Sequence, residues 1–231
     1  MTRLDFIPGT LCDERMWSRL TPSLRGGFEF NHVPLHKART RAQMQQLISA
    51  HSAPSAHLVA FSLGAYLAIE HVLAHPERVQ SLVLIANSAR GLSDAEIQTR
   101  RRIIPMLERN AYSGMTRQRL REVLHPDHFE DQSIVDVIQQ MALDLGKDVL
   151  LAQFTASMER PDLMDRLSEI ACPVLIVGAE GDQLVDAAIL RDMHARLPHA
   201  RLSMHEGSGH MIPLEIPQTL AADILAFHDA A

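Results

Sequence analysis

The stretch that decides the fold is His57–Glu70, HLVAFSLGAYLAIE. Its first part, Leu58–Phe61, is a short apolar run of the kind that forms a buried strand. From Ala65 to Ala74 the apolar side chains are spaced as in an amphipathic helix. Only one or two residues remain for the turn between strand and helix. The backbone therefore has to bend sharply at Ser62.

A sharp bend would expose the Ser62 hydroxyl above the free N–H groups at the start of the next helix. This arrangement is a nucleophile elbow, whose usual pattern is Gly-x-Ser-x-Gly. The chain reads Ala60-Phe61-Ser62-Leu63-Gly64. Alanine in the first position adds a single methyl group, and we interpret it as a tolerated variant. On these residues alone, a helix-capping role for Ser62 is an equally good interpretation.

Length and composition limit the classes of protein to consider. With 231 residues, the chain can form one α/β domain, or a small core with an inserted subdomain. A formal net charge of −6 argues against general nucleic-acid binding. No apolar run approaches the roughly 20 residues of a membrane span, and MTRLDFIPGT lacks the apolar core of a signal peptide. Cys12 and Cys172 do not suggest a disulfide framework. We expect a cytoplasmic protein without nucleic-acid or membrane partners.

Strand and helix patterns alternate on both sides of this stretch. Before it, a strand is predicted at Arg3–Ile7, ended by the turn signal Pro8-Gly9, and alternating side chains predict another at Phe28–Val33. After it, Ser81–Ala86 is a nearly continuous apolar run, as expected of a strand covered on both faces. This alternation predicts right-handed crossovers and a mostly parallel sheet. Helices are expected from Asp13 or Glu14 onward and over Arg41–His51.

The alternation stops between Gly91 and about Ile170, where only helical patterns occur. These patterns cover Asp94–Leu107, Thr116–Leu124, Gln132–Leu145 and Asp148–Met158. Strands return at Pro173–Val177 and Ala200–Met204, with helices around Ala187–Leu197 and Pro217–His228. We therefore expect a core formed by residues 1–90 and 171–231, and a helical cap inserted at residues 91–170.

In open parallel sheets, ligands bind at the carboxyl ends of the strands. Two of these ends carry the partners that Ser62 would need, namely Asp182 in GAEGDQL and His210 in EGSGHMIP. A histidine with a pKa near about 6.5 can take a serine proton near neutral pH. An aspartate beside it holds the required imidazole tautomer and stabilises the cation. The order Ser, Asp, His is the one that this architecture imposes.

Other residues compete for these roles. Asp186, expected at the start of the next helix, is an alternative acid. His194, His199 and His205 are alternative bases, placed in the preceding helix, in a turn and at a strand end.

A metal or nucleotide cofactor is not predicted. His71 and His75 stand four residues apart on one predicted helix, which is a spacing that can bind a metal. No acidic or cysteine residue lies at a matching ligand spacing. The glycine-rich turns Gly26-Gly27 and Gly207-Ser208-Gly209 lack the following lysine of a phosphate loop.

Five motifs together give the chain a family resemblance: PGTLCDERMW, AFSLG, HPERVQSLVLIANS, PVLIVGAEGD and GSGHMIPLEIP. Over nearly its whole length the chain resembles the α/β-hydrolase superfamily, and it is similar to carboxylesterases of the pimeloyl-carrier-protein methyl ester esterase type. The resemblance implies an α/β fold with a mostly parallel sheet of about six strands flanked by helices, without the family's leading hairpin and with an inserted helical cap.

The resemblance also implies roles for individual residues. Ser62 would be the nucleophile, Asp182 the acid and His210 the base. The backbone N–H groups of Thr10 and Leu63 would form an oxyanion hole. The family usually has His-Gly before the oxyanion residue, whereas this chain has Pro-Gly.

The predicted cap is rich in arginine between residues 100 and 121. One interpretation is a solvated helix face. The other is that some of these arginines attract a carboxylate, coenzyme A or an acyl carrier protein. Candidate substrate-binding residues in the cap are Arg101, Arg102, Phe154 and Met158.

We therefore predict a serine hydrolase that cleaves a carboxylic ester or thioester through an acyl-enzyme, without a cofactor. Its substrate would be a small-molecule ester or other acyl compound, and the candidates include anionic and carrier-bound acyl groups. The same triad can serve C–C bond hydrolysis, a lyase step or a cofactor-free perhydrolase. A non-catalytic ligand-binding protein of this fold is the alternative from another class. The sequence leaves open whether the protein is a monomer or a homodimer.

Overall fold

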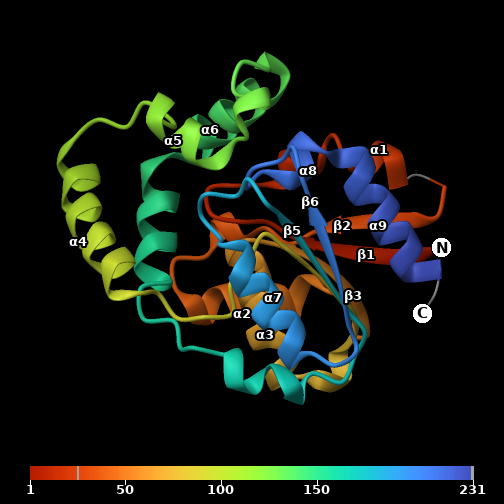
Figure 1. The fold of residues 1–231 in the computed structure, drawn as a ribbon. Coiled ribbons are helices and arrows are strands. Elements are labelled where there is room, and N and C mark those ends of the chain that lie inside the picture. Colours follow the sequence, from red (N-terminus) through yellow and green to blue (C-terminus); the bar gives the residue numbers. More distant parts are fainter. Residues whose placement is uncertain (25, 230–231) are drawn as a thin grey trace.

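The computed structural model describes residues 1–24 and 26–229. Its centre is a six-stranded sheet in the order β2-β1-β3-β4-β5-β6 (Figure 1). All five strand pairings are parallel, as the sequence predicts. The strands are β1 (Thr2–Ile7), β2 (Phe28–His32), β3 (Ala56–Phe61), β4 (Val79–Ile85), β5 (Val174–Ala179) and β6 (Ala200–His205).

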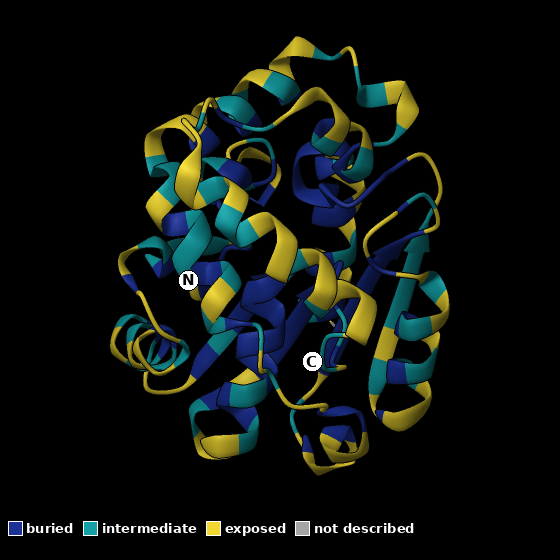
Figure 2. Ribbon diagram, turned by 90° about the vertical axis from the view of Figure 1, so that its left-hand side faces the viewer, coloured by how far each residue is buried: buried dark blue, intermediate teal, exposed yellow. Residues whose placement is uncertain are grey.

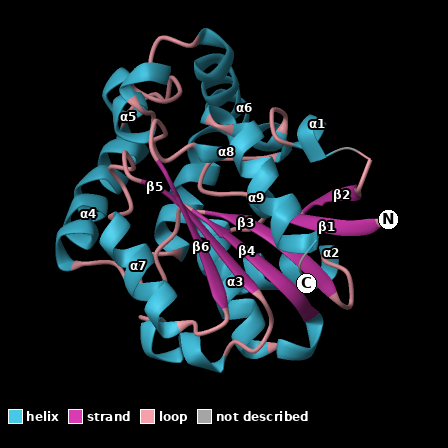
Figure 3. Ribbon diagram, turned by 45° about the vertical axis from the view of Figure 1, so that its right-hand side comes forward, coloured by secondary structure: helices cyan, strands magenta, loops and turns pink. Residues whose placement is uncertain are grey.

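The α-helices are α1 (Thr21–Leu24), α2 (Arg41–His51), α3 (Leu63–Ala74), α4 (Asp94–Arg109), α5 (Arg117–Val123), α6 (Gln132–Ala156), α7 (Ala187–Arg196), α8 (Ile212–Glu215) and α9 (Pro217–Asp229). Short 3-10 turns are η1 (Glu14–Trp17), η2 (Leu35–Lys37), η3 (Pro76–Arg78), η4 (Pro126–His128) and η5 (Met164–Glu169). Helices α2, α3 and α7 pack on one face of the sheet, and α1, α8 and α9 pack on the other. The result is a three-layer α/β arrangement (Figure 3).

Strand β3 shows how the sheet divides the core. Leu58 and Ala60 contact the layer that contains α3, whereas Val59 and Phe61 contact the opposite layer. All four side chains are buried, because a parallel sheet covered on both faces leaves neither side of a central strand in water. Figure 2 shows the buried strands at the centre of the molecule.

The segment from residue 91 to residue 170, which the structure describes in full, contains helices and no strand, as predicted. Gly146 lies inside α6 with φ +73° and ψ −179°, and it divides this helix at the point where two separate helices are predicted. Helix α6 packs against the turns η1 and η2. Helix α4 lies at the outer side of this segment, has no fully buried residue and exposes Met106 to 62% (Figure 1).

The helix expected from Asp13 or Glu14 onward is much shorter than the sequence suggests. Asp13 does cap a turn, because its side chain accepts from Arg15 N at 3.0 Å. That turn ends at Trp17, and a second short helix begins at Thr21. Proline is tolerated in the first turn of a helix but not in its interior, so Pro22 favours a new start over a continued helix.

Within the described residues, no helix is both long enough and apolar enough to cross a lipid bilayer.

Candidate active site

Ser62 occupies the sharp turn between β3 and α3. Its backbone has φ +52° and ψ −115°, a conformation that is strained for any residue with a side chain. The Ser62 N–H donates to Ile85 O at 2.9 Å and so ties the turn to β4. The structure therefore has the elbow geometry that the sequence predicts at this residue.

Two glycines allow the turn to pack against the loop after β1. A methyl group on Gly64 would lie 2.6 Å from Ile7 O. On Gly9 it would lie 2.7 Å from the Phe61 ring and 3.2 Å from Ser62 Cβ. These distances are shorter than van der Waals contact, so a larger residue at either position would move the elbow away from the loop.

His210 lies between Ser62 and Asp182. Its Nε2 is 3.0 Å from Ser62 Oγ, and its Nδ1 is 2.8 Å from Asp182 Oδ2. An ionised carboxylate only accepts hydrogen bonds, so Nδ1 carries the ring proton and Nε2 accepts from the serine hydroxyl. The imidazole also packs on the Phe61 ring, with 5.0 Å between centroids. His210 and Asp182 are buried, and Ser62 is half-buried.

The loop after β5 fixes Asp182 in this orientation. Its Oδ1 accepts from Leu184 N at 2.8 Å and from Val185 N at 3.1 Å. This leaves Oδ2 directed at His210. The alternative acid, Asp186, is exposed and caps α7 by accepting from Ala188 N at 2.8 Å.

The alternative bases have other environments. His205 Nε2 is 2.6 Å from Asp223 Oδ2, and His194 Nε2 is 3.2 Å from Ala200 O. His199 is exposed. Of the histidines after β5, the structure brings His210 to Ser62.

The backbone groups of the predicted oxyanion hole flank the elbow. Leu63 is the first residue of α3. Thr10 follows Gly9, where an added methyl group would lie 3.2 Å from Ser62 Cβ. No hydrogen bond joins the N–H of Thr10 or of Leu63 to another described residue.

Gln153 contacts the loop that carries Thr10, and no pattern in the sequence singled it out. Its Oε1 accepts from Leu11 N at 2.7 Å, next to Thr10. Leu11 has φ +56°, so this hydrogen bond holds a strained residue. The Gln153 side chain is fully buried, and its Nε2 has no hydrogen-bond partner among the described residues. In the sequence it is one polar residue in an apolar helical pattern, which gives no distinctive signal.

The cap residues proposed from the sequence lie in different surroundings. Arg101 and Arg102 are exposed on α4, whereas Phe154 is half-buried. Their neighbour Arg100 points inward, stacks on the Phe154 ring at 5.0 Å and donates to Ser157 Oγ at 2.6 Å. Burial, with the nearby charge of Arg160, lowers the pKa of Arg100 to about 10.

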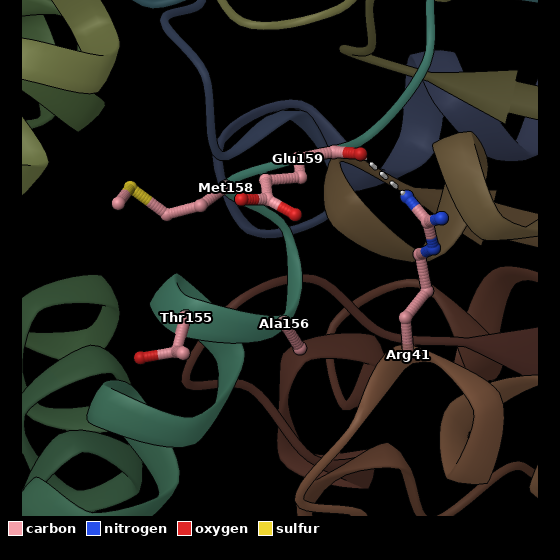
Figure 4. A pocket seen from close by; sticks show the side chains of 5 residues that line it. All are labelled: Arg41, Thr155, Ala156, Met158 and Glu159. Atoms are coloured by element: carbon pink, nitrogen blue, oxygen red, sulfur yellow. Dashed lines mark hydrogen bonds between the residues drawn. The ribbon is translucent and has the colours of Figure 1, made fainter.

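Met158 lines a separate hollow of about 380 Å³ between α2 and the end of α6 (Figure 4). Arg41 lines one side of this hollow and donates to Glu159 O at 3.2 Å. None of Ser62, Asp182 and His210 lines it. The other lining residues are Thr155 and Ala156.

No group of three or more potential metal ligands among His, Cys, Asp and Glu occurs within the described part of the chain. The rings of His71 and His75 lie 5.2 Å apart. Burial lowers the pKa of His71 to about 4.

The sequence profile of the family described as alpha/beta hydrolase fold matches residues 17–217. The chain belongs to this family. Solved structures of similar fold include a thermophilic esterase from Thermogutta terrifontis, with a TM-score of 0.86 and 20% identity over 100% of this chain and 90% of that one. A hydrolase from Pseudomonas aeruginosa PA01 has a TM-score of 0.85 and 22% identity over 98% of this chain and 89% of that one.

Among curated relatives of this α/β hydrolase is a protein from Burkholderia vietnamiensis named 2-hydroxy-6-oxononadienedioate/2-hydroxy-6-oxononatrienedioate hydrolase. It is 27% identical over 185 residues, which cover 74% of this chain. The match spans 62% of the length of that relative. The names of these three proteins describe them as hydrolases or as an esterase.

Proposed function

We propose that this protein is a serine hydrolase that cleaves carboxylic esters or thioesters through an acyl-enzyme. One observation carries the proposal, namely the continuous hydrogen-bonded line from Ser62 Oγ through His210 to Asp182, with distances of 3.0 Å and 2.8 Å. A serine hydroxyl is a weak nucleophile until a base accepts its proton. The line supplies that base and holds its tautomer.

In the proposed reaction, Ser62 Oγ attacks the acyl carbon while its proton passes to His210 Nε2. The carbonyl oxygen becomes an oxyanion, which the N–H groups of Thr10 and Leu63 bind. His210 then protonates the leaving alcohol or thiol as its bond to carbon breaks. Water, deprotonated by the same imidazole, attacks the acyl-enzyme and releases the acid and the free serine.

The names of the relatives support a hydrolase. They are compatible with two kinds of substrate bond, an ester bond and a C–C bond. The Thermogutta terrifontis structure is named as an esterase, which agrees with ester cleavage. The Burkholderia vietnamiensis relative is named as a hydrolase of a 2-hydroxy-6-oxo dienedioate. C–C bond hydrolysis by the same three side chains is therefore the second candidate.

We further propose that residues 91–170 act as a cap over the site, built on a core of residues 1–90 and 171–231. The half-buried Phe154 and the inward-pointing Arg100 support a cap that contributes to substrate binding. A cytoplasmic location belongs to the same proposal. It is supported by Cys12 and Cys172, which are both free thiols in the structure.

Hydrolysis of p-nitrophenyl esters with acyl chains of increasing length tests the proposal, together with a 2-hydroxy-6-oxo dienoate and anionic esters. We expect ester turnover by the wild type, and a loss of kcat of roughly 1,000-fold or more in Ser62→Ala. Cleavage of the dienoate alone would favour the second candidate. A folded wild-type protein that cleaves neither class would contradict the proposal.

A further inference from the structure

Glu215, at the end of α8, is a buried carboxylate that is not part of the triad. It is 5% exposed. Both of its oxygens lie 3.1 Å from Gly209 N, and Oε2 also accepts from His125 N at 2.8 Å. Gly209 directly precedes His210, whereas His125 follows α5 in the proposed cap. The Glu215 side chain therefore joins the loop of the proposed base to the segment that follows α5.

The segment Val123–His125 also holds the loop of His210 through its backbone. Val123 O accepts from His210 N at 2.9 Å and from Met211 N at 3.2 Å. A methyl group on Gly209 would lie 2.6 Å from His125 N. The segment Val123–His125 and the loop of His210 are thus in direct backbone contact, with no room for a side chain between them.

The loop of the proposed acid meets the same segment. A methyl group on Gly181, the residue before Asp182, would lie 2.8 Å from His125 Cδ2 and 2.6 Å from Ser208 O. Gln183 Nε2 donates to Arg121 O at 3.3 Å. The acid and base loops therefore converge on one short piece of chain, from Arg121 in the last turn of α5 to His125 just before η4.

A buried carboxylate at this position lowers the stability of the fold, because burial removes water from its charge. Burial raises the pKa of Glu215, while the hydrogen bonds from His125 and Gly209 act in the opposite direction. A neutral apolar side chain of similar size would avoid the penalty. Such a side chain could not accept hydrogen bonds from Gly209 N and His125 N, which both point toward residue 215.

We propose that Glu215 is a positioning residue for the proposed base. Its carboxylate fixes the Gly209 peptide against Val123–His125 and thereby holds the His210 imidazole within hydrogen-bond distance of Ser62 Oγ. The inference rests on the proposed function, since a position for the base matters only where the base acts. It adds a residue that touches neither substrate nor reacting atoms.

Glu215→Gln is the sharpest variant. Glutamine has nearly the same volume, but it replaces one oxygen with an NH₂ group, which then faces a backbone N–H donor. We expect kcat to fall roughly tenfold or more, because small displacements of a reacting group strongly reduce rate. We expect KM to change less than about twofold, because the substrate is not contacted. The rate at which a fluorophosphonate labels Ser62 is expected to fall in proportion to kcat.

Asp5→Asn is the matched control for loss of a buried carboxylate. Asp5 in β1 is fully buried and accepts from Asn31 Nδ2 at 2.7 Å and from Ala53 N at 2.9 Å. It has no hydrogen bond to the acid or base loop among the described residues. We expect this variant to lose stability while it keeps the wild-type kcat per folded molecule.

Each outcome bears on the proposal. An unlabelled Ser62 in the wild type removes the proposed function and this inference with it. A labelled wild type, with Glu215→Gln unchanged in kcat and in labelling rate, overturns the inference alone and leaves Glu215 a purely structural residue. If Glu215→Gln does not fold, Glu215→Asp replaces it, because it keeps both acceptor oxygens on a shorter stem. An unchanged kcat in that variant overturns the inference equally.

Discussion

His210 Nε2 lies 3.0 Å from Ser62 Oγ, although 148 positions separate the two residues in the chain. The contact follows from the parallel sheet. Ser62 comes directly after β3, Asp182 after β5 and His210 after β6, and the carboxyl ends of parallel strands share one edge. The chemistry that we propose depends on this convergence.

Asp182→Asn tests the acid. Asparagine can keep the acceptor for Leu184 N and Val185 N, so the loop is expected to fold. Its NH₂ group would face His210 Nδ1 and favour the wrong imidazole tautomer. We expect kcat to fall by about 100-fold to 10,000-fold with little change in the free energy of unfolding. Asp186→Asn, an exposed helix cap four residues later, is the control and should retain wild-type kcat.

Gly64→Ala tests the close packing of the elbow. Helix propensity alone would make alanine more stable by about 1 kcal/mol. The overlap with Ile7 O at 2.6 Å predicts the opposite, a loss of about 2 kcal/mol or more in the free energy of unfolding. Gly27→Ala, where an added methyl group meets nothing within 4 Å, should stay within about 0.5 kcal/mol of the wild type. Urea unfolding of both variants measures the difference, and equal stability would contradict the packing argument.

Gln153→Met tests the support of the oxyanion loop. Methionine fills a similar volume but cannot accept from Leu11 N, and an unpaired buried N–H costs about 1–3 kcal/mol. We expect that loss of stability together with a fall in kcat of roughly tenfold, because Thr10 is the next residue. Gln45→Met on α2 also removes a half-buried amide, whose donor bond is to Leu67 O at 3.0 Å. If both variants lower kcat equally, Gln153 has no special role.

His71, which is buried, and His228, which is half-buried, predict a loss of stability in mild acid. Burial lowers the pKa of His71 and of His228 to about 4 each. Between about pH 6.5 and pH 4 the unfolded chain binds protons at these residues and the folded chain does not, so the free energy of unfolding falls as the pH falls. From pH 7 to pH 5 the buried His71 accounts for about 2 kcal/mol. The half-buried His228 accounts for less, because water screens its charge.

His71→Leu should remove the share of His71 from this pH dependence. Urea unfolding at pH 7 and pH 5 measures that share directly. His199→Leu, at an exposed position, serves as the control and should leave the pH dependence as it is in the wild type. A wild type whose stability is the same at both pH values would contradict the burial argument for these two side chains.

The parts of the fold that local pattern determines were predictable. The apolar run Leu58–Phe61 and the nearly continuous run Ser81–Ala86 predicted the central strands, because strands covered on both faces need apolar residues at every position. The one or two residues left between the strand pattern and the helix pattern predicted the tight turn at Ser62. The return of strand pattern after residue 170 then placed Asp182 and His210 at the same edge of the sheet as Ser62.

The parts that depend on tertiary packing were not predictable. Gln153 and Glu215 act on residues far away in the chain, Leu11 and His125, and no local spacing records those contacts. The orientation of the arginines on α4 was also not predictable. Which arginine of α4 points inward depends on how that helix packs on α6, and it is Arg100 rather than its two exposed neighbours.

Covalent labelling with a fluorophosphonate, followed by intact-mass measurement and peptide mapping, tests whether Ser62 is an activated nucleophile. We expect one adduct per wild-type chain, located on Ser62, no adduct in Ser62→Ala and much slower labelling in folded His210→Ala. A folded wild type that takes up no probe, or an adduct that persists in Ser62→Ala, would contradict the proposal.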